Sequence, residues 1–167
     1  PVMDLAVTYA VRLKLPGARD GIIRVKDSLL ETYGVNREEL HERALLNMGK
    51  DGYHFERVEE ALCGIPGLCW DSGPVRMYVL TNRTKTYGAA GLLNKGIVGK
   101  FTKDCDYYII PSSIHELIFI PASDVGDAGE LDRLVEDISR TVVMEKERLS
   151  YHSYFYDAFA QEARICR

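Results

Sequence analysis

The chain has 167 residues, of which 25 are acidic and 21 are basic, so its formal net charge is −4. A hydrophobic share of 46% with 28% charged residues is typical of a globular domain and excludes a disordered or collagen-like chain. The acidic excess disfavours binding to nucleic acid, which needs clustered basic side chains to neutralise phosphates. Because no apolar run approaches the ~18 residues that cross a bilayer, we expect neither a membrane span nor a membrane partner.

The cysteines and histidines show no spacing typical of a redox or metal site. No C-x-x-C pair occurs, and a zinc site with four ligands would need an irregular long-range arrangement. No secretory leader is visible, so we expect a cytoplasmic protein with no metal or other cofactor. The side chains concerned are Cys63, Cys69, Cys105, Cys166, His41, His54, His115 and His152.

The first half begins with a pattern typical of a β-hairpin. Apolar and polar residues alternate over residues 4–14, which predicts a strand with one buried face. The turn-forming pair Pro16-Gly17 precedes a second apolar stretch at 21–25. Because such turns join antiparallel neighbours, these two stretches are predicted to pair with each other.

Helical spacing follows the hairpin. The apolar residues around position 30 predict a short helix that ends at Gly34, because glycine readily adopts the left-handed cap conformation. Asn36 is expected to cap a second helix, which should end at Gly49. The spacing of apolar residues over 55–62 predicts another short helix.

The second half predicts strands and further helices. Apolar runs indicate strands at 75–81, 106–111 and 115–121, of which the last two should be antiparallel neighbours. Helical spacing predicts helices at 89–101 and 127–143. The second of these helices has a capping signal at its start and an apolar face made of Leu131, Leu134, Val135, Ile138 and Val142.

These elements predict an α+β fold with a mostly antiparallel sheet and helices packed on one or both faces. The aromatic tail after Leu149 is expected to pack on the domain's own sheet, with a surface for a partner as the alternative. Residues 1–167 are expected to form a single domain. A division into two small lobes near 64–74 is the alternative, because that stretch is rich in proline and glycine.

The loop between the last two predicted strands holds the strongest catalytic candidates, Ser112, Ser113, His115 and Glu116. A hydroxyl nucleophile needs an imidazole within hydrogen-bond reach and a third group that orients the imidazole. Successive residues of a strand point to opposite faces, so His115 and Glu116 are not expected to meet directly. No G-x-S-x-G motif surrounds either serine, and the alternative is a turn whose hydroxyls satisfy backbone groups.

A glycine-containing segment provides a weaker candidate for ligand binding. Gly88 and Gly91 flank the start of a predicted helix, where backbone N–H groups can face an anion, and Arg83 and Lys85 lie close by in the sequence. The alternative is that the glycines allow close packing of the helix on the sheet.

Six segments together carry a family resemblance, and they read LAVTY at 5–9, YGVNREEL at 33–40, ALLN at 44–47, MYVLTN at 77–82, GAA at 88–90 and IPSSIHE at 110–116. They resemble a bacterial domain-of-unknown-function family that is common in gut anaerobes, and the resemblance spans nearly the whole chain. It implies that this chain is the C-terminal region of a longer protein. The family has no established activity, so it implies no catalytic role for Ser112, Ser113, His115 or Glu116.

The sequence shows no established motif for catalysis or for binding a metal, nucleotide or nucleic acid, and we therefore expect a non-catalytic binding or regulatory module for a protein partner or a small ligand. The alternative is a hydrolase-like enzyme that uses the Ser112, Ser113, His115 and Glu116 loop on a small anionic substrate. In that case His115 would serve as general base or acid, and Arg83 or Lys85 would hold the substrate. The oligomeric state is left open.

Overall fold

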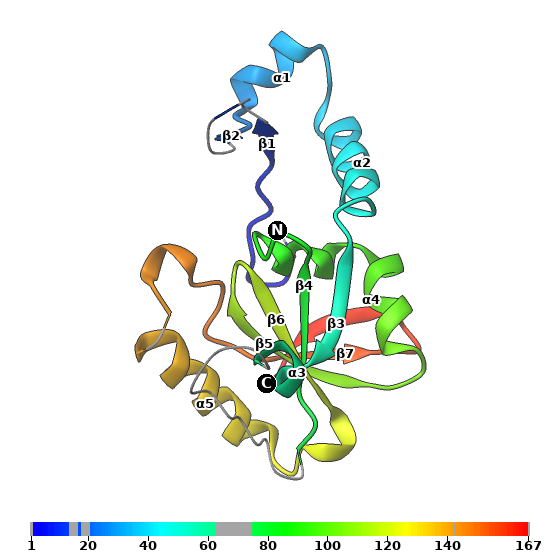
Figure 1. Cartoon of the computed structure of the whole chain (residues 1–167), viewed down its shortest axis with the longest axis vertical. Helices are drawn as coiled ribbons and strands as arrows, with labels where there is room; N and C mark the ends of the chain where they lie inside the picture. The colour runs from blue at the N-terminus through cyan, green and yellow to red at the C-terminus, as the bar shows by residue number, and fades with distance from the viewer. Residues whose placement is uncertain (1, 14–16, 18–20, 63–74, 142, 167) are drawn as a thin grey trace. The chain divides into compact units, whose positions relative to one another are not determined.

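The computed structural model describes residues 2–13, 17, 21–62, 75–141 and 143–166, apart from the side chains at 134, 137–139 and 141 (Figure 1). The chain divides into two compact units, Pro1–Met48 and Gly49–Arg167, here called unit 1 and unit 2. The alternative boundary predicted near 64–74 lies outside the described residues.

Unit 1 contains the predicted hairpin. Strands β1 (Ala10–Leu13) and β2 (Gly21–Arg24) are antiparallel, with Val11 opposite Ile23. The first strand is shorter than the predicted 4–14, because the second strand offers only four residues for pairing. The alternation of apolar residues therefore extends beyond the residues that pair with β2.

The two helices of unit 1 confirm the predicted end of the first at Gly34 and the predicted cap of the second at Asn36. Helix α1 (Asp27–Tyr33) ends at Gly34, whose φ of 64° is left-handed. Helix α2 (Arg37–Met48) is capped by Asn36, whose Oδ1 accepts a hydrogen bond from the Glu39 N–H at 2.8 Å. Glu39 Oε2 accepts in return from the Asn36 N–H at 2.9 Å. This reciprocal pair satisfies two N–H groups at the start of the helix.

Unit 2 is built on a six-stranded sheet in the order β3-β4-β6-β5-β7-β8, and every neighbouring pair is antiparallel. This sheet confirms the predicted α+β class. The strands are β3 (Tyr53–Arg57), β4 (Tyr78–Asn82), β5 (Tyr107–Ser113), β6 (Glu116–Pro121), β7 (Tyr154–Asp157) and β8 (Glu162–Ile165).

Helices cover both faces of this sheet. Helix α5 (Ala128–Thr141) packs Leu131 and Val135 against Ile110 and Ile120 on one face. The other face carries an aromatic cluster in which Phe119 is fully buried. Helix α4 (Lys95–Thr102) packs against this cluster, and the 3-10 helix η1 (Gly88–Leu93) lies at the end of the sheet, where Gly91 approaches Tyr53 (Figure 1). This two-sided burial places the main core in unit 2.

Two predicted helices of unit 2 were wrong in their extent. Phe55 lies in strand β3, and only α3 (Val58–Leu62) is helical, because the 53–57 segment pairs with β4 along its whole length. The predicted 89–101 helix is interrupted at Asn94, whose Oδ1 accepts from the Gly96 and Ile97 N–H groups at 3.0 and 3.2 Å. Asparagine competes with the backbone in this way and starts a new helix.

The aromatic tail was predicted to pack on the sheet, but it supplies two strands of the sheet itself, because β7 pairs with β5 and β8 pairs with β7. Tyr154 and Tyr156 of β7 are 0% and 3% exposed, whereas Phe159 in the following turn is fully exposed. Helix α5 matches most of the predicted 127–143 range, and Asp127 Oδ1 caps it by accepting from the Gly129 N–H at 2.8 Å.

Candidate functional site

The glycine-containing segment at 88–91 and the 111–116 loop are separate candidates in the sequence, and they meet at one end of the sheet. The backbone N–H of Tyr87, just before η1, donates to His115 Nδ1 at 3.1 Å. Within η1, the Ala89 N–H donates to the Ile114 carbonyl at 3.3 Å. We call the cluster of Tyr87, Gly88, His115 and Glu147 the His115 site.

Gly88 is required by the close approach of two backbone segments at this site. A Cβ atom at position 88 would collide with the His115 carbonyl oxygen and would lie 2.5 Å from Thr81 Oγ1. The Thr81 hydroxyl itself donates to the same carbonyl at 2.9 Å. Gly91 is similarly close to a neighbour, because its Cβ would lie 2.5 Å from a ring carbon of Tyr53. Both glycines therefore permit tight packing on the sheet.

A buried asparagine shapes the loop that leads into the site. Asn82 is 2% exposed, and its Oδ1 accepts from the N–H groups of Thr84 and Thr86, both at 3.2 Å. Lys85 and Tyr87 adopt left-handed φ values of 49° and 56°. Non-glycine residues in that region carry backbone strain, which the surrounding hydrogen bonds must hold in place.

Burial also perturbs the tyrosine that packs beside this loop. Desolvation raises the pKa of Tyr53 to about 12, and the negative charge of Asp51 acts in the same direction. A hydrogen bond with Asn82 opposes the shift. Tyr53 is therefore a neutral structural group at ordinary pH.

The imidazole of His115 has one nitrogen engaged by backbone and one that faces a carboxylate. Because Nδ1 accepts the Tyr87 N–H, the neutral ring carries its proton on Nε2. Nε2 lies 3.9 Å from Glu147 Oε1, in the 3-10 helix η3 (Glu145–Glu147). Glu147 also anchors the turn, since its carbonyl accepts the Ile114 N–H at 2.9 Å. The Nε2–H is thus a hydrogen-bond donor rather than a proton acceptor.

The remaining candidates of the 111–116 loop bond within their own turn. Ser112 Oγ donates to Glu116 Oε1 at 3.4 Å, and Ser113 Oγ accepts from the His115 backbone N–H at 3.1 Å. Within the described residues, neither hydroxyl has a hydrogen bond to the imidazole. The turn itself is tight, because β5 ends at Ser113 and β6 begins at Glu116.

The basic candidates lie at the edge of the same region. Arg83 and Lys85 are both exposed, and the Arg83 guanidinium lies close to Gly52, where a Cβ atom would be 2.9 Å from Nη2. The Tyr87 and Ala89 N–H groups that could have faced an anion already have acceptors in the protein. Sequence reasoning found these residues and missed Glu147, because no spacing rule connects it with His115.

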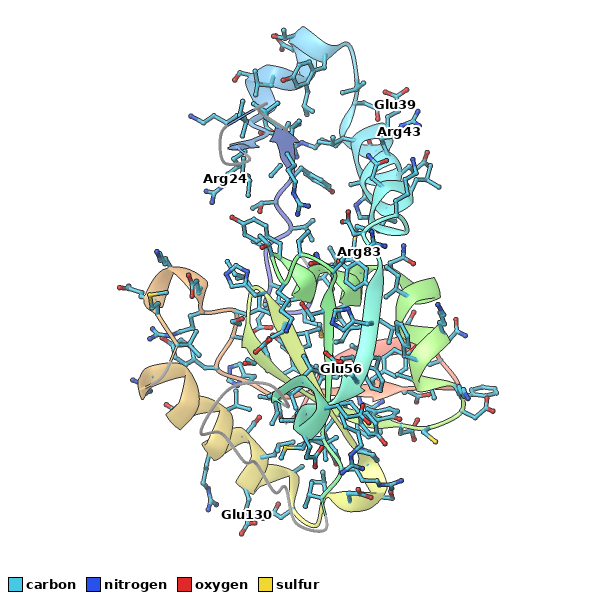
Figure 2. The ribbon with its side chains drawn as sticks, in the orientation of Figure 1. Arg24, Glu39, Arg43, Glu56, Arg83 and Glu130 are labelled. Atoms are coloured by element: carbon cyan, nitrogen blue, oxygen red, sulfur yellow. The ribbon has the colours of Figure 1, made fainter. Side chains whose placement is uncertain are left out.

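A separate groove lies along α2 in unit 1. Its volume is about 340 Å³. Apolar groups form part of its lining, and Glu39 and Arg43 project from the same side of α2 (Figure 2). Within the described residues, Glu42 and Arg43 have no hydrogen-bond or ion-pair partner. We call it the α2 groove, and it is lined by Gly34, Val35, Glu39, Leu40, Glu42, Arg43 and Leu46.

Metal ligands do not converge in the part of the chain that the structure describes, where no three His, Cys, Asp or Glu side chains are grouped. Cys105 and Cys166 are free thiols, and burial raises the pKa of the Cys166 thiol. Among the described helices, none combines the length and the apolar character needed to cross a membrane.

The fold and the site define a class of protein, an α+β protein with a two-sided antiparallel sheet and a polar cluster at one sheet end. The chain belongs to the family of unknown function DUF5688, whose family model matches residues 1–158. No curated protein and no solved structure matches the chain.

Proposed function

We propose that the chain is a non-catalytic binding module for a protein partner, and that unit 1 supplies the binding surface through the α2 groove. The observation that carries this proposal is the burial pattern of unit 1. None of its described residues, at 2–13, 17 and 21–48, is buried, although several are large and apolar. Folded domains normally bury such side chains in a core of their own.

The exposed apolar side chains of unit 1 occur on both its strands and its helices. Ile22 and Ile23 are 46% and 47% exposed, and Leu46 in the α2 groove is 65% exposed. The groove is lined by both apolar and charged side chains, as binding sites for protein segments are. Its polar members, Glu42 and Arg43, are free to pair with groups of a partner.

A hydrolase-like activity of the 111–116 loop has less support. The hydroxyls of Ser112 and Ser113 bond elsewhere, and the neutral His115 ring offers a donor, not an acceptor, at Nε2. The arrangement supports recognition more directly than proton abstraction.

The test is site-specific photo-crosslinking in cells that naturally produce the protein. A benzophenone amino acid replaces Leu46 in the groove or, as a control, Met144 in unit 2, which is also exposed. We expect a discrete protein adduct from position 46 and none from position 144. The protein in the adduct is then purified and titrated with the wild-type chain, Leu46→Glu and Met144→Glu. The groove variant should bind at least about tenfold more weakly, and the control should bind like the wild type.

Two results would overturn the proposal: no protein adduct from position 46, or equal affinity of the wild type and Leu46→Glu for the purified partner. A parallel screen with p-nitrophenyl esters tests the enzyme. Ester turnover by the wild type would favour the hydrolase instead if it were abolished by Ser112→Ala or Ser113→Ala and also by the separate variant His115→Gln.

A further inference from the structure

Strand β8 forms an edge of the sheet, with a neighbouring strand on one side only among the described residues. It pairs with β7 in a continuous antiparallel register, from Glu162 opposite Asp157 to Ile165 opposite Tyr154. Proline residues and β-bulges commonly prevent an edge strand from pairing further, and β8 contains neither. The open edge of β8 can therefore accept another strand.

The pairing with β7 fixes which backbone groups of β8 point to the open edge. The Cys166 N–H donates to the Ser153 carbonyl at 3.0 Å, so the backbone groups of Cys166 point toward β7. Successive residues of a strand alternate in this direction. The backbone groups of Arg164 and Glu162 therefore also point toward β7, whereas the N–H and carbonyl of Ala163 point to the open edge.

The charged side chains of β8 differ in their surroundings. Glu162 and Arg164 are exposed and lie two residues apart, on the same face of the sheet. The Glu162 carboxylate lies 3.2 Å from the Lys95 ammonium, but Asp157 lies opposite Glu162, so this end of β8 has an acidic excess. The Arg164 guanidinium lies 4.6 Å from the centre of the Phe155 ring and has no carboxylate partner among the described residues. The edge thus carries opposite charges at its two ends.

A second copy of β8, placed antiparallel to the first, complements this charge pattern in one register. With Ala163 opposite Ala163 of the second copy, each Glu162 lies opposite Arg164 of the other copy. A register centred on Glu162 or on Arg164 would place like charges directly opposite each other, which is destabilising. Registers centred on Gln161 or Ile165 would leave both charged residues without an opposite charge. The charges therefore select the register centred on Ala163.

We propose that two copies of the chain associate through their β8 strands, antiparallel and with Ala163 at the two-fold axis, to form one continuous sheet. Each Ala163 N–H then donates to the Ala163 carbonyl of the other copy, and two pairs of Glu162 with Arg164 flank these bonds. Both copies use the same edge, so assembly stops at a dimer. The edge is short, so we expect a dissociation constant between about 1 μM and about 1 mM. This surface belongs to unit 2, and the inference does not depend on the α2 groove.

The test measures the mass of the full chain by sedimentation velocity from about 1 μM to about 1 mM. The mean mass of the wild type should rise from 18.9 kDa toward twice that value and no further. Glu162→Arg and Arg164→Glu each place like charges opposite one another, so each should raise the dissociation constant at least about tenfold. Glu136→Arg on α5 is the matched control, because Glu136 also pairs with an exposed basic side chain, Arg140. It should dimerise like the wild type, and circular dichroism checks that every variant is folded.

A mixing experiment tests the register. Glu162→Arg makes the edge basic at both positions, and Arg164→Glu makes it acidic at both. An equimolar mixture of the two variants should therefore form a heterodimer that is at least about tenfold tighter than either homodimer. The variant that carries both substitutions exchanges the two charges and should dimerise like the wild type.

Hydrogen exchange tests the backbone pairing directly. The Ala163 amide of the wild type should exchange more slowly at high protein concentration than at low concentration, because the dimer supplies its acceptor. A wild type that stays monomeric, charge-reversal variants that dimerise like the wild type, or a mixture that forms no heterodimer would each overturn the inference. A dimer in which the exchange of the Ala163 amide stays unchanged would overturn it as well.

Discussion

The two units of this chain contrast in what stabilises their secondary structure. Unit 2 buries a sheet between helices, with Leu80, Ile109 and Phe119 at 0–1% exposure. Unit 1 also contains strands and helices, but none of its described residues is buried. Its helices rely on local features such as the Asn36 cap and the left-handed Gly34. Regular secondary structure therefore does not by itself indicate a core.

The largest expected difference between the two units is the loss of stability when an apolar side chain is removed. Phe119→Ala removes a fully buried ring of unit 2, so it should lower the free energy of unfolding by about 3–5 kcal/mol. Leu46→Ala in unit 1 should change it by less than about 0.5 kcal/mol, because that side chain is mostly exposed. Urea unfolding followed by circular dichroism measures both. Equal losses would show that unit 1 has a core after all.

The next largest loss of stability is expected at Gly88, where two backbone segments approach closely in the His115 site. Gly88→Ala should destabilise the protein by about 2–3 kcal/mol, because the new methyl group meets the His115 carbonyl and the backbone N of Asn82. Gly126→Ala is the matched control, since no atom lies within 4 Å of its Cβ position. Thermal unfolding of both variants tests the pair. Similar melting temperatures would contradict the tight packing at position 88.

Acid should weaken unit 2 through a single ion pair. Arg76 donates to both carboxylate oxygens of Asp124, at 2.8 and 2.7 Å, and holds the pKa of Asp124 well below its usual range. A lowered folded-state pKa stabilises the protein above about pH 4, the unfolded value, and this contribution is lost as the pH falls further. Unfolding free energies between pH 2 and 6 should therefore fall less steeply for Asp124→Asn than for the wild type. Parallel curves would refute the assignment.

Loss of a helix cap should affect unit 1 alone. Asn36→Ala removes the side-chain acceptor for the Glu39 N–H and should cost about 1 kcal/mol of local helix stability. Hydrogen exchange should become faster at the start of α2, while the amides of β5 and β6 keep their protection. If the sheet amides also lost protection, the stabilities of the two units would be coupled.

The smallest expected effect has the opposite sign. The hydroxyl of Tyr156 is buried and has no hydrogen-bond partner among the described residues. Tyr156→Phe removes this uncompensated polar group, so stability should stay constant or rise by up to about 1 kcal/mol. Tyr53→Phe serves as a contrast, since its hydroxyl interacts with Asn82 and its loss should destabilise. A lower stability of Tyr156→Phe would indicate a partner for the hydroxyl.

Elements with local sequence signals could be predicted before the fold was known. The Asn36 cap and the Gly34 end of α1 follow from side-chain and backbone chemistry within a few residues. The antiparallel pair at 106–121 also followed from two apolar runs joined by a short turn. In each case the residues that decide the conformation are neighbours in the chain.

The way in which distant segments combine became visible in the folded chain alone. Phe55 became a strand residue because β4 pairs with it, against its helical spacing. The His115 site unites Tyr87, His115 and Glu147 from three separate segments, and no sequence pattern links them. The sequence could suggest Gly88 and His115 one at a time. Their meeting depends on the long-range order of the sheet, which periodicity along a single chain does not encode.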